Sequence, residues 1–137
     1  QGADEQARTL AAIAGVLPEM DLVVSTAAIP GRPAPRLITA EMVGAMKPGA
    51  VIVDVSAETG GNCELTRPGE TIESHGVTIM GPLNLPSTMP FHASAMFGRN
   101  VLTLLQHLST KEGALQLDVS DEITGAMAVT HDGQVRT

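Results

Sequence analysis

The chain has 137 residues, 43% of them hydrophobic, which suffices for one packed domain or parts of two and excludes wholesale disorder. Its net charge of −7, two phenylalanines and lack of tryptophan and tyrosine argue against a nucleic-acid partner, which needs basic clusters and aromatic platforms. With one cysteine, no signal peptide and no apolar run of about 20 residues, we expect a soluble protein of a reducing, cytoplasmic compartment.

The chain is predicted to open with an amphipathic helix over residues 5–17, where leucine and isoleucine recur at helical spacing until a proline ends the pattern. The proline-rich residues 30–35 can form neither a helix nor a central strand, because proline lacks an amide donor and fixes φ. A second, short helix is predicted over residues 40–46, with Thr39 as its N-terminal cap.

Three short, continuous apolar runs at residues 22–25, 50–53 and 77–80 are predicted to be strands. Such runs are typical of strands buried on both faces, as in a parallel sheet, and the helix between them supplies the crossover. Parallel sheets bind ligands at the carboxyl ends of their strands. The loops expected at that edge are residues 25–30, 54–62 and 81–87, which are rich in Gly, Pro, Asn and Thr.

A long helix is predicted over residues 89–108, with one apolar face and with Ser87 or Thr88 as its cap. The tail has a different character. Residues 115–119 alternate between apolar and polar, and Asp132-Gly133 is a hairpin turn signal, so we expect short strands there.

The three loops resemble the α subunit of proton-translocating nicotinamide nucleotide transhydrogenase. The resemblance rests on TAAIPGRPAP at 26–35, VDVSAETGGNCE at 53–64 and GPLNLPS at 81–87, in order and with matching spacing. It implies an α/β fold comprising the C-terminal half of a Rossmann-like parallel sheet, a long interdomain helix and a short β hairpin tail. On this basis residues 1–85 are part of a NAD-binding domain, residues 86–108 form an interdomain helix, and residues 109–137 return to a first domain. The family's glycine-rich phosphate turn would precede Gln1.

The resemblance also implies cofactor contacts. Ala28 stands where the family has leucine and a backbone contact, and Thr9 stands where an acidic or amide side chain touches the nucleotide; a plain helix-surface position is the alternative for Thr9. Asp54 could equally orient its own loop through backbone hydrogen bonds, and the glycines could serve a tight turn without a ligand. The full set of candidate cofactor-binding residues is Thr9, Thr26, Ala27, Ala28, Asp54, Glu58, Gly60, Gly61, Asn62, Asn84 and Leu85.

No residue is predicted to be catalytic. Glu58 aligns with a catalytic aspartate of alanine dehydrogenase, but a transhydrogenase passes hydride from one nicotinamide to another and moves no proton at the reacting carbon. Glu58 is therefore expected to orient the cofactor or the loop. The four histidines lack ligand spacing, so no metal site is expected.

The resemblance implies NAD(H) as the cofactor of this part and NADP(H) on a partner subunit. It also implies membrane subunits that move protons, a homodimeric parent protein and a cytoplasmic location peripheral to the inner membrane. Two other hypotheses stay open: an alanine dehydrogenase-like oxidoreductase, and an inactive fragment or assembly module. Because the phosphate turn is missing, the chain alone is expected to be inactive and to bind no NADH.

Overall fold

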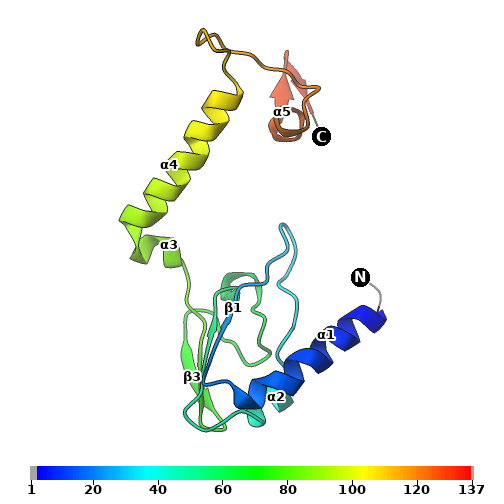
Figure 1. Cartoon of the computed structure of the whole chain (residues 1–137), viewed down its shortest axis with the longest axis vertical. Coiled ribbons are helices and arrows are strands. Elements are labelled where there is room, and N and C mark those ends of the chain that lie inside the picture. The colour runs from blue at the N-terminus through cyan, green and yellow to red at the C-terminus, as the bar shows by residue number, and fades with distance from the viewer. Residues whose placement is uncertain (1–2, 137) are drawn as a thin grey trace. The chain divides into compact units, whose positions relative to one another are not determined.

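Short strands and helices alternate through the first two thirds of the chain, as its apolar runs predict. The computed structural model describes residues 3–136, which fall into two units, one ending at Thr88 and the other beginning at Met89. Figure 1 shows both units, and each is described by itself below.

The first unit contains a four-stranded sheet in the order β1-β2-β4-β3. The strands β1 (Leu22–Ser25), β2 (Val51–Asp54) and β4 (Val77–Met80) are parallel, as their apolar runs predicted. The edge strand β3 (Thr71–Ser74) runs antiparallel to β4. The α/β class with a parallel sheet is thereby confirmed.

The sequence analysis missed β3, whose only large apolar residue is Ile72. The turn that joins it to β4 consists of His75 and Gly76, which have φ values of 54° and 75°. Two consecutive positive φ values are the requirement of a tight type I′ hairpin, so the connection is regular although its sequence is not the usual Asn-Gly.

The core lies on one face of the sheet. Val23, Ile52 and Ile79 are register partners across the three parallel strands and share this face, where Leu17 and Val43 also belong to the buried cluster. The other face of β1 carries Leu22 and Val24, which are 61% and 57% exposed. Within the described residues β1 is thus buried on one face only, contrary to the prediction of burial on both.

The helices of the first unit follow the predicted pattern with shifted ends. The cap at Thr39 is confirmed, since its Oγ1 accepts a hydrogen bond from the Met42 amide at 3.2 Å. The pattern predicted over residues 5–17 divides at its end, where Pro18 tightens the last turn into a 3₁₀ helix. The elements are α1 (Ala3–Val16), η1 (Leu17–Glu19), α2 (Ala40–Gly44), η2 (Ala57–Thr59) and α3 (Leu85–Thr88).

The second unit begins with α4 (Pro90–His107), which matches the predicted long helix. The cap prediction was wrong: Met89 occupies the N-cap position without a side-chain hydrogen bond. The Ser87 and Thr88 hydroxyls bond instead to the carbonyl oxygens of Asn84 and Leu85, because both residues belong to the short helix α3.

The tail forms the predicted hairpin, from β5 (Thr130–His131) and β6 (Gln134–Val135), with positive φ at the turn residues 132–133. Residues 115–119 form no strand, only an isolated bridge at Leu115, which corrects that expectation. A further helix that we did not predict, α5 (Glu122–Met127), precedes the hairpin. No helix in the described part of the chain is long and apolar enough to cross a membrane.

Candidate functional site

Loops that are far apart in the sequence meet where the parallel strands end. Ser25 and Asp54 are register partners at the last position of β1 and β2, so the loops that follow them start side by side. The loop after β4 joins the same edge through a hydrogen bond between Glu58 and Asn84. The predicted convergence of three loops is therefore present.

Asn62 ties the first two loops together. Its Oδ1 accepts from the Ala27 amide at 3.0 Å, and its Nδ2 donates to the carbonyl oxygens of Ala27 and Pro35, each at 2.8 Å. Its own carbonyl oxygen accepts from the amides of Leu37 and Ile38 at 2.8 and 3.0 Å. The side chain is fully buried, and backbone groups of the protein use both its oxygen and its nitrogen. Asn62 is therefore a clamp between loops.

Asp54 organises the loop that follows it. Its Oδ1 accepts from the Ser56 amide at 3.1 Å, and its Oδ2 accepts from the Cys63 amide at 2.9 Å and the Thr66 hydroxyl at 2.7 Å. A fully buried carboxylate needs such donors, because an uncompensated buried charge is costly. These hydrogen bonds are of the kind expected if Asp54 orients its own loop, one of the two roles considered for it above.

The two adjacent glycines have different surroundings. At Gly61, with φ of 77°, an added Cβ would lie 2.7 Å from Oδ2 of Asp54 and 3.0 Å from Cβ of Thr66. At Gly60, with φ of 104°, an added Cβ would meet nothing within 4 Å. Gly61 is thus required for packing, whereas Gly60 leaves backbone open to an approaching group.

The exposed candidate residues lie around this buried framework. Thr26 and Ala28 are exposed on either side of the anchored Ala27. Glu58 is exposed on η2, and its Oε1 accepts a hydrogen bond from the backbone amide of exposed Asn84. Leu85, which follows Asn84, is half-buried at the start of α3. Thr9 belongs to another element, α1, where it is exposed.

Cys63 is packed into the framework. It is fully buried, and this burial raises the pKa of its thiol. A raised pKa lowers the thiolate fraction, so the residue is suited to packing rather than to nucleophilic attack.

Sequence reasoning missed several framework residues. Ser56 donates from its hydroxyl to the Ala27 carbonyl oxygen at 2.9 Å, Thr66 binds Asp54, and Thr59 accepts through its carbonyl oxygen from the Ala34 amide at 2.8 Å. Each of these three bonds joins residues at least 12 positions apart, so no local motif predicts it. Only the small, polar character of the loop gave a signal.

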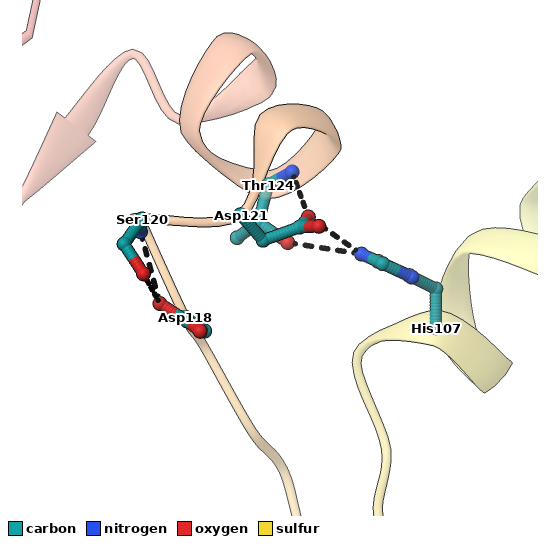
Figure 2. Close-up of polar contacts among 5 residues, drawn as sticks. All are labelled: His107, Asp118, Ser120, Asp121 and Thr124. Carbon is teal, nitrogen blue, oxygen red and sulfur yellow. Dashed lines mark hydrogen bonds and ion pairs between the residues drawn. The ribbon is translucent and has the colours of Figure 1, made fainter.

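A second polar cluster occupies the second unit, where the end of α4 meets the start of α5 (Figure 2). The imidazole Nε2 of His107 lies 2.8 Å from Oδ2 of Asp121 and 3.2 Å from the Thr124 hydroxyl. The Thr124 amide, followed by His107, lowers the pKa of Asp121 to about 2. Nearby, the hydroxyl and then the amide of Ser120 lower the pKa of Asp118. This cluster caps α5 and was not predicted.

The edge of the sheet carries two carboxylates, one buried and one exposed. Its buried carboxylate is engaged by three donors, and its exposed carboxylate accepts a backbone hydrogen bond. Among residues 3–136, no group of three or more histidine, cysteine or acidic side chains could hold a metal ion.

The chain is similar to known proteins over nearly its whole length. The family described as "Alanine dehydrogenase/PNT, C-terminal domain" matches residues 3–137. The NAD(P) transhydrogenase subunit alpha of Cereibacter sphaeroides is 45% identical over 130 residues, which cover 93% of this chain and 25% of that protein. The alanine dehydrogenase of Bacillus subtilis is 43% identical over 83 residues, covering 57% of this chain and 22% of that protein.

A solved structure agrees in fold. The crystal structure of transhydrogenase from Sinorhizobium meliloti superposes with a TM-score of 0.79 at 40% identity, covering 99% of this chain and 38% of that one. The chain thus spans between about a quarter and two fifths of the transhydrogenase chains that it matches. This chain belongs to the alanine dehydrogenase/PNT family, and residues 3–137 match the model of the family's C-terminal domain.

Proposed function

We propose that this chain is part of the NAD(H)-binding component of a proton-translocating NAD(P) transhydrogenase, an oxidoreductase and translocase. The observation that carries the proposal is the 45% identity to a transhydrogenase α subunit over 93% of the chain, an alignment long enough to include all three loops at the sheet edge. In this role the chain helps to hold NAD(H) while hydride passes to NADP+ on a partner subunit. Membrane subunits move the proton, so the parent protein, a homodimer, lies at the inner membrane through its partners.

The groups at the sheet edge fit a bound nicotinamide nucleotide. Gly60 offers backbone with open space above it, Thr26 and Ala28 are exposed, and Asn84 presents an exposed carboxamide. These residues would hold the nucleotide, whereas the buried Asp54, Gly61 and Asn62 position the loops that carry them.

The chemistry itself needs little from the protein besides position. The bound nicotinamide supplies or accepts the hydride. Because that transfer moves no proton at the reacting carbon, the residues of this chain bind and orient the ring, and none is assigned as a base. The carboxylate of Glu58 accordingly has an orienting role, which is developed below.

We further propose that residues 1–85 belong to the nucleotide-binding domain, that residues 86–108 form an interdomain helix, and that residues 109–137 pack on a preceding domain. A dinucleotide also requires a site for its pyrophosphate, which related folds build at a glycine-rich turn and a helix N-terminus. Among the described residues, no Gly-x-Gly-x-x-Gly sequence leads from a strand into a helix. Calorimetry of the isolated chain with NADH is expected to show no measurable binding, and micromolar binding would contradict this part of the proposal.

An alanine dehydrogenase-like activity is the second candidate, favoured by the 43% identity to the Bacillus subtilis enzyme. That alignment covers 57% of the chain against 93% for the transhydrogenase subunit. In addition, Glu58 replaces the aspartate that the resemblance places at this position in alanine dehydrogenases. A third candidate is an assembly module that binds no nucleotide.

A transplant tests these candidates. In the Cereibacter sphaeroides α subunit, the aligned 130 residues are replaced by those of this chain, and the chimera is assembled with its partner subunits. We expect NADH to reduce an NADP+ analogue whose reduced form absorbs at a different wavelength. The control transplants the aligned 83 residues into the Bacillus subtilis alanine dehydrogenase, where we expect alanine oxidation to be lost. A folded transhydrogenase chimera that binds no NADH would refute the proposal, and activity of the control alone would favour the second candidate.

A further inference from the structure

Glu58 connects two of the three loops at the sheet edge. It lies on η2, after β2, and its Oε1 accepts a hydrogen bond from the backbone amide of Asn84, which follows β4. The two residues are 26 positions apart and both are exposed. An exposed carboxylate engaged by a distant backbone amide acts on the conformation of that backbone, because it fixes the amide in space.

The backbone of Asn84 is held on both sides. Its φ of 50° lies in the left-handed region, which asparagine tolerates better than most residues. Its carbonyl oxygen accepts from the amide of Ser87 at 3.0 Å and from the Ser87 hydroxyl at 2.9 Å. With its amide and carbonyl both engaged, the part of Asn84 that has no hydrogen bond to the described protein is its exposed carboxamide.

We propose that Glu58 is a positioning residue that acts through Asn84: its carboxylate holds the Asn84 backbone so that the carboxamide faces a nicotinamide nucleotide at the sheet edge. The inference rests on the proposed function and names the pair of residues that orients the ligand. A carboxamide both donates and accepts hydrogen bonds, so its direction decides whether it matches the polar groups of the nucleotide. Glu58 itself does not touch the ligand in this arrangement.

Four variants of the transhydrogenase chimera test the pair. Glu58→Ala removes the acceptor, and we expect the Kd for NADH to rise about tenfold, the effect of losing one hydrogen bond that preorganises the site. Glu58→Gln retains a carbonyl oxygen that can accept from the same amide, so it should restore affinity to within about twofold of the parent chimera. Asn84→Gly keeps the left-handed backbone accessible but removes the carboxamide, and it should weaken binding by a similar factor. In the double variant Glu58→Ala/Asn84→Gly, the second change should add little.

Glu64→Ala is the matched control. The Oε2 of Glu64 accepts from the backbone amide of Ala40 at 2.8 Å, so this variant loses the same kind of bond and the same charge, but at the start of α2. We expect unchanged affinity for NADH, and far-UV circular dichroism checks that every variant is folded.

The outcomes separate the inference from the proposed function. A parent chimera that is folded but binds no NADH refutes the proposed function and the inference with it. If the parent binds and the effects of Glu58→Ala and Asn84→Gly multiply in the double variant, Glu58 acts independently of Asn84 and the inference is overturned. Failure of Glu58→Gln to restore affinity, with Glu64→Ala unchanged, would show that the charge itself acts on the ligand and would equally overturn it.

Discussion

Replacing Asn62 with alanine is the sharpest test of how the site is built. The change deletes the acceptor of the Ala27 amide and the Nδ2 donor to the Pro35 carbonyl oxygen, whereas the Ala27 carbonyl oxygen keeps the Ser56 hydroxyl at 2.9 Å. Two backbone groups therefore lose their partners. At about 1–3 kcal/mol for each unsatisfied buried group, and because both groups are only partly buried, we expect a loss of about 2–4 kcal/mol in unfolding free energy. This is a large part of the roughly 5–15 kcal/mol that stabilises a typical domain.

Urea unfolding monitored by far-UV circular dichroism measures the effect, since the chain contains neither tryptophan nor tyrosine for a fluorescence signal. The matched control is Asn100→Ala, an exposed asparagine on α4, which should change the free energy by no more than about 0.5 kcal/mol. If Asn62→Ala unfolds at the same urea concentration and with the same slope as the parent chain, Asn62 is not a clamp and the reasoning is refuted.

Three further outcomes are expected. Gly61→Ala and Gly60→Ala share the cost of a left-handed backbone. The added Cβ of Gly61→Ala also lies 2.7 Å from Oδ2 of Asp54, so the urea midpoint of this variant should correspond to a further loss of about 1–3 kcal/mol in unfolding free energy. Equal urea midpoints for the two variants would contradict this contact. The pKa of Asp121 is lowered to about 2, so the ionised carboxylate stabilises α5 fully above the ordinary pKa of 3.8 and this stabilisation is lost as the pH falls through about 2. The chemical shift of the Thr124 amide, which donates to this carboxylate, should change with a midpoint near pH 2. A midpoint near pH 4 would contradict the lowered pKa. Burial raises the pKa of the Cys63 thiol, so a disulfide reagent should label it far more slowly in the folded chain than in urea, and equal rates would show that the framework is open.

The parallel sheet could be predicted from the sequence because its signals are local. Each of its three strands is a continuous apolar run, and such a run needs no knowledge of its partners to be recognised. The hairpin at residues 132–133 was equally accessible, because an Asp-Gly pair tolerates the two positive φ values of its turn. These parts of the fold follow from backbone chemistry within a few residues.

The missed elements depend on distant contacts. The strand β3 has one large apolar residue, Ile72, and gains its order by pairing with β4. The helix α5 is only six residues long, and its cap at Asp121 is itself held by His107, which lies 14 positions earlier. Neither the pairing nor the histidine contact can be read from the local pattern.

The candidate site shows the same division. The edge and its loops could be predicted, because parallel topology brings the carboxyl ends of strands together. By contrast, the sequence does not predict which loop residues are buried in the framework and which are exposed around it. Asp54 and Asn62 are polar residues in a glycine-rich loop, and only their burial and hydrogen bonds show that the protein itself uses their polar atoms.

The division between buried and exposed loop residues also decides which positions can be used to test ligand recognition. The motif that makes the resemblance specific is Gly-Gly-Asn-Cys, yet Gly61, Asn62 and Cys63 are buried and build the loop. The buried residues therefore fix the loop backbone, and the exposed positions are the ones accessible to a ligand. Glu58 and Asn84 are two such positions, and for that reason variants at these residues, rather than at the buried motif, distinguish ligand recognition from folding.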